Sequence, residues 1–106
     1  MSSCIFCDIV AGKAKRSLVW EDENVMVIND IHPAASTHIL VIPKKHAVDL
    51  TDMTDKEVTR LLLAVKKVIK DLGISKYRIV HNGGGAQLIN HAHVHIMGAI
   101  DPHRKL

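Results

Sequence analysis

The sequence has few aromatic side chains: one Trp, one Tyr and one Phe make up 3% of its 106 residues. Its core must therefore be built from aliphatic residues. It also lacks any apolar run near the roughly 18–20 residues that a membrane-spanning helix needs, which argues against a membrane protein. The start of the chain has no basic segment followed by an apolar one, so we expect no secretory signal and a cytoplasmic location.

Strong net charge is missing as well. With neutral histidines the formal charge is only +3, and the lysine pairs at 44–45 and 66–67 are short. Such pairs are more typical of a solvated face than of a polyanion groove, so neither a nucleic acid nor a membrane is expected as a partner. The length predicts a single domain, residues 1–106, that buries roughly two-thirds of its unfolded surface.

Hydrophobic periodicity predicts an α+β fold. Apolar residues recur at helical spacing over 54–72, with a capping box at Thr54–Glu57 and Gly73 at the end. The expected order is a short helix over 4–11, strands over 18–20, 25–28 and 38–42, the long helix, and strands over 77–81 and 91–97. The short connection between the last two strands favours antiparallel pairing. We therefore expect an antiparallel sheet of about five strands with the long helix packed on one face.

Eight histidines in 106 residues are an excess that points to metal or phosphate chemistry. Three of them, His91, His93 and His95, alternate with apolar residues in the last predicted strand. Strand side chains alternate between faces, so these imidazoles should share one face while residues 92, 94 and 96 pack under the helix. The pattern fits two tasks: gripping a catalytic metal, or supplying an imidazole nucleophile whose neighbours bind phosphate.

A glycine-rich segment, Asn82–Gln87, lies just before these histidines and favours the second task. Its backbone N–H groups can approach an anion closely, although three glycines alone are more often only a turn. Two other polar residues flank predicted strands. Asp30 is either a turn residue or a carboxylate for sugar hydroxyls, and His38 is either a core or edge histidine or a contact of the reactive strand.

The two cysteines of the sequence form a CxxC motif, Cys4 and Cys7. A redox role would need this motif at a helix start in a βαβ setting, which the sequence does not predict. A structural zinc would need two more ligands, for which His46 and His91 are the candidates, and that choice leaves His93 free. The third interpretation is a pair of ordinary buried thiols.

Together these motifs resemble the histidine triad (HIT) family, and in particular its branch of small nucleoside-phosphoramidate hydrolases. That family is defined by histidines alternating with apolar residues, as over 91–97 here. The likeness covers nearly the whole chain and includes CIFCDI at 4–9, NDIHP at 29–33, THILVIPKKH at 37–46 and Gln87 ahead of the triad. The combination is far more specific than any of its parts.

The resemblance implies a homodimer with a continuous sheet, a site for purine nucleoside monophosphates and a structural zinc. His93 would be the nucleophile, His95 a phosphate contact and His38 a histidine hydrogen-bonded into the triad. The base would lie among Phe6, Ile9 and Ile28, and Asp30, with Ile31 beside it, would hold the ribose. The residues near the phosphate and leaving group would be Asn82, Gln87 and Leu88. The zinc would be held by Cys4, Cys7, His46 and His91.

The chain differs from the family pattern on the leaving-group side. Leu88 replaces a residue that is often Ser, Ala86 replaces a usual Gly, and the glycine loop is about two residues shorter. We expect these differences to affect leaving-group preference and rate more than nucleotide binding.

The expected activity is hydrolysis of purine nucleoside phosphoramidates or adenylates to AMP or GMP through a covalent nucleotidyl-histidine, without a catalytic metal. Three alternatives stay open: a dinucleoside polyphosphate hydrolase, a non-catalytic nucleotide-binding regulatory dimer, and a metal-dependent hydrolase with His91, His93 and His95 as ligands. Activity that survives chelation would count against the metal-dependent hydrolase, and tight nucleotide binding with no turnover of any phosphoramidate would favour the non-catalytic dimer.

Overall fold

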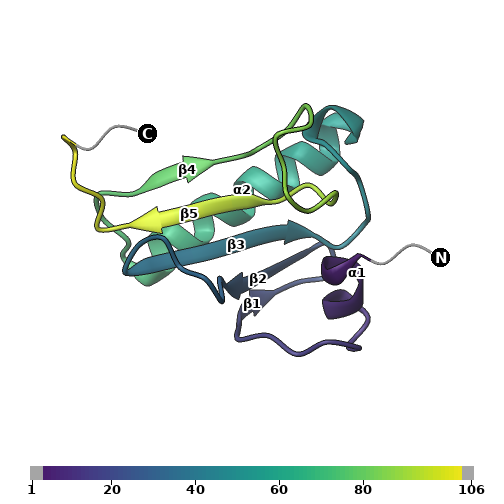
Figure 1. Ribbon diagram of the computed structural model, residues 1–106, viewed down its shortest axis with the longest axis horizontal. Helices are drawn as coiled ribbons and strands as arrows, with labels where there is room; N and C mark the ends of the chain where they lie inside the picture. Colours follow the sequence, from purple (N-terminus) through teal and green to yellow (C-terminus); the bar gives the residue numbers. More distant parts are fainter. Residues whose placement is uncertain (1–3, 104–106) are drawn as a thin grey trace.

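The backbone forms one antiparallel sheet of five strands in the order β1-β2-β3-β5-β4. The structure is a computed structural model and describes residues 4–103 (Figure 1). Its strands are β1 (Leu18–Glu21), β2 (Val25–Asn29), β3 (Thr37–Pro43), β4 (Arg78–Val80) and β5 (Val94–Gly98). Its helices are α1 (Ile5–Val10), the short 3-10 helix η1 (Leu50–Asp52) and the long α2 (Asp55–Leu72), which connects β3 to β4.

Local sequence signals set the bounds of α2. The Thr54 hydroxyl accepts the Glu57 N–H at 3.2 Å and the Glu57 carboxylate accepts the Thr54 N–H at 2.8 Å, which closes the predicted capping box. The helix ends at Gly73, whose φ of 61° is the left-handed conformation that favours glycine. Its buried side chains recur at helical spacing and face the sheet: Leu61, Ala64, Val65 and Val68.

The sheet separates two aliphatic clusters, because side chains alternate along each strand. On the α2 side, strand residues pack against the long helix: Val25, Val27, Ile39, Val41, Val94 and Ile96. On the α1 side, Phe6 and Ile9 of the short helix pack with Met26, Ile28, Leu40 and Ile42. Phe6 is the one aromatic residue among the buried members of these two clusters, so the expected aliphatic core is confirmed.

The predicted fold is confirmed, with one difference that matters for the site. The sequence predicts a last strand from residue 91, whereas β5 begins at Val94. The backbone before β5 is held by other bonds: the Ala92 N–H donates to the Ala47 carbonyl at 2.6 Å, and the His91 and His93 carbonyls contact histidine side chains. His91 and His93 therefore precede the strand, and His95 lies in it.

Several other element bounds differ from the prediction by one residue. β3 includes Pro43, which still pairs with Val25, and β4 is limited to Arg78–Val80. Within residues 4–103, no helix is both long enough and apolar enough to cross a membrane.

Candidate functional site

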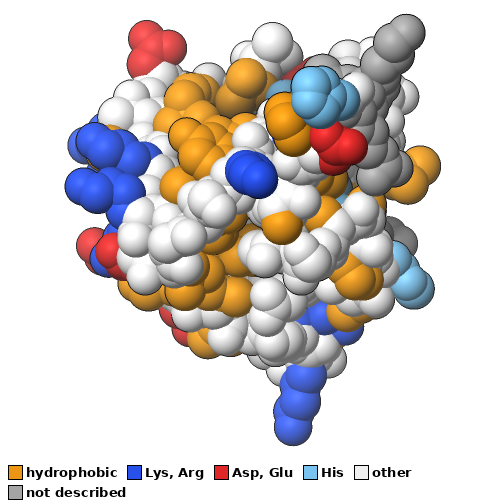
Figure 2. Space-filling model, turned by 90° about the vertical axis from the view of Figure 1, so that its left-hand side faces the viewer, with side chains coloured by type: hydrophobic (Ala, Val, Ile, Leu, Met, Phe, Trp, Pro, Cys, Tyr) orange, Lys and Arg blue, Asp and Glu red, His pale blue; other side chains and the backbone are white. Residues whose placement is uncertain are grey.

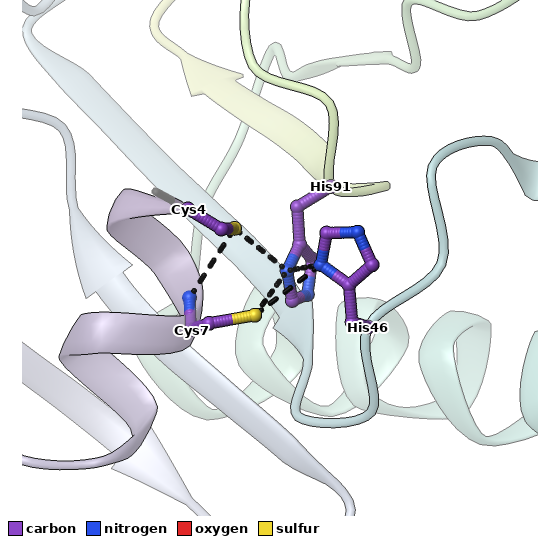
Figure 3. Close-up of side chains that lie close together, drawn as sticks. All are labelled: Cys4, Cys7, His46 and His91. Atoms are coloured by element: carbon purple, nitrogen blue, oxygen red, sulfur yellow. Dashed lines mark hydrogen bonds between the residues drawn. The ribbon is translucent and has the colours of Figure 1, made fainter. Parts of the chain in front are cut away.

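Four sulfur and imidazole donors from three parts of the chain converge, and we call them the Cys/His cluster (Figure 3). Cys4 and Cys7 lie at the start of α1, His46 in the loop after β3, and His91 in the segment before β5. Their ligand atoms all lie within 4.8 Å of one another. The distance is 3.3 Å from Cys4 Sγ to His91 Nδ1, 3.2 Å from Cys7 Sγ to His46 Nδ1, and 3.1 Å between the two Nδ1 atoms.

The start of α1 explains why the CxxC spacing brings two sulfurs together. Cys4 is the N-cap residue, and its Sγ accepts the Cys7 N–H at 3.4 Å, so both side chains belong to the first turn. Burial, and then the nearby Cys4 side chain, raise the pKa of the Cys7 thiol. A bound dication would oppose that shift, because coordination deprotonates a thiol.

His91 presents the nitrogen that a metal ion requires. Its Nε2 lies 2.7 Å from the Pro43 carbonyl, which can only accept, so Nε2 donates and Nδ1 of the neutral ring keeps its lone pair. Burial lowers the pKa of His91, which favours this neutral form. In a tetrahedral site with bonds of ~2.0–2.3 Å, ligand atoms stand roughly 3.3–3.8 Å apart, close to the spacing found here. The donor set therefore fits a zinc-type ion.

A second group of polar residues faces a cavity of about 390 Å³ on the α1 side of the sheet. Phe6, Ile28 and Leu40 contribute apolar wall, and Asp30 and the histidines described below contribute polar groups. An apolar cavity with a few convergent polar groups is the usual form of a small-molecule site.

Most residues predicted for the nucleotide site line this cavity: Phe6, Ile28, Asp30, Ile31, His38, Asn82, Leu88, His93 and His95. Two do not. Ile9 is buried in the cluster under α1. Gln87 instead braces the glycine loop, since its Oε1 accepts the Gly85 N–H at 2.9 Å and its Nε2 donates to the Val48 carbonyl at 3.3 Å.

Several lining residues were not predicted. Asn29 and His32 flank predicted residues in the sequence, and that adjacency is the signal that could have found them. Arg16 also lines the cavity, but it lies in the loop before β1 and carries no motif that marks it.

His93 has one free ring nitrogen. Its Nδ1 lies 2.8 Å from the His91 carbonyl and must donate to it, so the lone pair of the neutral ring is on Nε2. His93 is only 6% exposed, and its ring packs edge-on against Phe6, with the two ring centroids 5.0 Å apart. Burial lowers the pKa of His93, so the ring keeps its lone pair at lower pH than a free imidazole does. His93 can therefore act as a neutral nucleophile or base.

His38 and His95 form a hydrogen-bond chain in which the donor and acceptor of each bond can be assigned. The Ala34 N–H donates to His38 Nδ1 at 2.9 Å, so neutral His38 carries its proton on Nε2. That nitrogen lies 2.8 Å from His95 Nδ1 and 3.3 Å from the Asp30 carboxylate. When His38 donates to His95 Nδ1, the Nε2–H of His95 is left for a ligand.

The environment of His95 keeps its ring neutral. Burial, followed by His93 and His38, lowers its pKa to about 4, and Asp30 offsets part of this shift. The ring therefore offers a hydrogen bond rather than a positive charge near neutral pH. Ligand atoms of Asp30, His38 and His95 also lie within 4.8 Å of one another, which is close enough to hold a cation, but their contacts are already explained by hydrogen bonding.

The three triad histidines do not form one ligand set in the described part of the chain. His91 groups with the Cys/His cluster, whereas His95 groups with Asp30 and His38. This arrangement disfavours a metal-dependent hydrolase that would use His91, His93 and His95 together as ligands.

The antiparallel sheet, the Cys/His cluster and the histidine-lined cavity together are typical of one protein family. A comparison of the sequence with models of protein families identifies the same family. The HIT domain matches residues 11–101. Because the match covers most of the chain, the protein belongs to the HIT domain family, as its motifs predict.

Three similar proteins illustrate the relationship. Adenosine 5′-monophosphoramidase hnt1 of Schizosaccharomyces pombe is 37% identical over 97 residues, which cover 90% of this chain and 73% of the relative. The crystal structure of a HIT family hydrolase from Legionella pneumophila Philadelphia 1 has a TM-score of 0.83 at 37% identity and covers 93% of this chain and 95% of its own. A zinc-bound histidine triad family protein from Mycobacterium smegmatis has a TM-score of 0.85 at 35% identity, with coverage of 96% and 78%.

Proposed function

We propose that this protein is a nucleotide-binding hydrolase that cleaves purine nucleoside phosphoramidates or adenylates and releases AMP or GMP through a covalent nucleotidyl-histidine. The observation that carries the proposal is the tautomer and position of His93. Its Nδ1 donates to the His91 carbonyl, and the residue lines a cavity with apolar walls. Similarity to a phosphoramidase and to a HIT family hydrolase supports it.

The proposed chemistry has two displacements at the α-phosphorus. The His93 Nε2 lone pair attacks phosphorus, the bond to the leaving amine or phosphate breaks with its electron pair, and a proton from solvent neutralises the leaving group. Water then attacks the same phosphorus and gives up a proton to solvent, and the bond to Nε2 breaks and returns its electron pair to the ring. The product is the nucleoside monophosphate, and no step in this route requires a catalytic metal.

The remaining polar groups would supply positioning and charge stabilisation. The His95 Nε2–H is available to donate to a phosphate oxygen, and His38 orients that ring through Nδ1. Asp30 would accept ribose hydroxyls, because its carboxylate lines the cavity and is held by the His32 N–H at 2.8 Å. Phe6 and Ile28 would contact the purine.

A structural zinc is proposed at the Cys/His cluster. The donor types, the lone pair of His91 and the spacing of the four ligand atoms support it, as does the zinc-bound relative. Zinc there would tie α1, the loop after β3 and the segment before β5 together.

A homodimer is proposed through β4, one edge of the sheet. Leu62, Tyr77 and Ile79 are exposed hydrophobic residues that line one hollow between α2 and β4. Figure 2 shows hydrophobic side chains in the upper left of the face that it views, with Lys and Arg along the left edge and further hydrophobic side chains below. Antiparallel pairing of two β4 strands would continue the sheet and cover this surface. Light scattering on Ile79→Lys should show monomers, whereas Leu18→Lys on the opposite edge strand should leave the mass unchanged.

The experiment that tests the activity is mass spectrometry of protein quenched during turnover of an adenosine phosphoramidate. We expect an adduct of nucleotidyl mass that maps to His93. No adduct under fast quench, with activity lost on chelation, would favour a metal-dependent hydrolase instead.

One observation favours a non-catalytic nucleotide-binding dimer as the second candidate. Leu88, at the cavity, is fully exposed and has no hydroxyl to offer a leaving group. Tight binding of AMP without turnover of any phosphoramidate or dinucleoside polyphosphate would support that candidate.

A further inference from the structure

Asp49 ties three separate segments together beside the nucleophile. It is the N-cap of η1, where its Oδ1 accepts the Leu50 N–H at 2.7 Å. Its Oδ2 accepts the Gly84 N–H of the glycine loop at 2.7 Å. Its Oδ1 also lies 3.3 Å from Nε2 of His81, the residue that follows β4. One carboxylate thus connects η1, β4 and the glycine loop.

His81 carries this connection to the segment that holds the nucleophile. The β4–β5 ladder stops at the pair Val80 and His95, so backbone pairing ends just before His93. The His81 side chain takes over there, because its Nδ1 lies 3.1 Å from the His93 carbonyl. That carbonyl and the Asp49 carboxylate can only accept, so the His81 ring satisfies both when it donates from both nitrogens.

The glycine loop is built around this pair. A Cβ at Gly83 would collide with the Asp49 carboxylate and lie 3.0 Å from His81 Nε2, so a side chain at Gly83 would displace one of the two. The hydrogen bond from Gly84, and then the one from His81, hold the pKa of Asp49 below its usual range, which keeps it charged. A charged carboxylate is the stronger acceptor for both donors.

We propose that Asp49 and His81 are positioning residues of the proposed hydrolase. Together they fix the position of the His93 backbone relative to the glycine loop, so that the His93 ring is placed for attack on phosphorus. The inference rests on the proposed function, and neither residue has to touch the substrate. Misplacing a reacting group by about 1 Å can cost on the order of a hundredfold in rate. Asp49 and His81 are 32 positions apart in the sequence and belong to no motif, so the fold is what makes them a pair.

Two matched pairs of variants test this positioning. Asp49→Asn removes the charge, and Asp52→Asn makes the same change three residues on, where the carboxylate accepts the Asp49 N–H and, within residues 4–103, makes no hydrogen bond to the glycine loop. At residue 81, Asn places an amide nitrogen near the position of Nδ1, and Gln places one near Nε2. His81→Asn can therefore keep the contact with His93, whereas His81→Gln can keep only the contact with Asp49.

The kinetic readout is the single-turnover rate of nucleotidyl-histidine formation from an adenosine phosphoramidate, with AMP affinity measured in parallel. We expect Asp49→Asn and His81→Gln to slow adduct formation about ten- to a hundredfold, with AMP affinity changed less than about threefold. Asp52→Asn should stay within about threefold of wild type in both, and His81→Asn, which can keep the bond to the His93 carbonyl, should lose less rate than His81→Gln. Equal losses in all four variants, or none in any, would overturn the proposal.

A second readout does not require activity. In ¹⁵N NMR spectra, the His93 ring signals should move in Asp49→Asn and His81→Gln but not in Asp52→Asn. If wild type forms no adduct, the proposed hydrolase fails, and these spectra alone decide whether the pair positions His93. Unmoved His93 signals would refute the positioning role.

Discussion

His91 and His93 are two residues apart and carry the same side chain, yet the backbone gives their neutral rings opposite tautomers. His91 donates from Nε2 to the Pro43 carbonyl and turns the Nδ1 lone pair toward the thiols. His93 donates from Nδ1 to the His91 carbonyl and keeps the Nε2 lone pair for the cavity. Because a carbonyl can only accept, the place of one carbonyl decides which nitrogen is basic. The chemistry of each histidine thus follows from its backbone neighbours.

The strongest way to separate these two histidines is His93→Ala. Turnover should fall by more than the ~10²–10⁴ that general acid–base assistance supplies, because this variant removes the proposed nucleophile. AMP binding and metal content should persist, since Asp30 and the Cys/His cluster are untouched. His93→Gly should regain some activity with added imidazole. A nucleotidyl adduct mapped to His91 or His95 of wild-type protein would reverse the assignment.

The converse change is the double variant Cys4→Ser with Cys7→Ser. It should lose the proposed zinc, about one ion per chain, and a stability loss of a few kcal/mol would lower Tm by on the order of 10 °C. Turnover per folded molecule should change much less, because the His91 carbonyl still orients His93. Elemental analysis and thermal unfolding provide the measurements. Full zinc content in the double variant would disprove the assignment of the Cys/His cluster.

Asp30→Asn should have a smaller effect, confined to the cavity. Losing a hydrogen bond to a charged group costs roughly 1.5–3 kcal/mol, so ribonucleotide affinity should fall about tenfold or more. Calorimetry with AMP and 2′-deoxy-AMP should show a smaller difference between the two ligands than in wild type. If the difference is unchanged, Asp30 does not bind the ribose.

The smallest expected effect is a displaced pH dependence. Burial lowers the pKa of His93 and lowers that of His95 to about 4, so both rings stay neutral as pH falls through ~6.5, the ordinary imidazole value. The acid limb of kcat/KM should therefore lie below ~6.5. The unfolded chain binds protons from ~6.5 downward while folded His95 does not, so the free energy of unfolding should decrease between ~6.5 and about 4.

NMR titration of the ring protons checks this prediction directly. The His95 midpoint should be near 4, and a midpoint at or above ~6.5 would contradict it. Metal content has to be followed at each pH, because thiolate and imidazole ligands also take up protons as pH falls.

The sequence predicts much of the fold because its signals are local. The capping box at Thr54, the left-handed Gly73 and the alternation of apolar residues each act over a few residues. The alternation also places His95 on the face of β5 opposite Val94 and Ile96, which pack toward α2. What it misses depends on distant partners. The start of β5 at Val94 follows from bonds to Ala47 and His81, and the pairing of Asp49 with His81 exists only once the sheet has formed.

Residue 91 serves the two sites through different atoms, its ring at the Cys/His cluster and its main-chain oxygen at His93. Every amino acid has that oxygen, so a descendant of this chain could exchange both cysteines and both cluster histidines for aliphatic residues and still orient the ring of residue 93. The two sites are therefore free to evolve separately, and the loss of a metal centre in a lineage need not signal the loss of its chemistry.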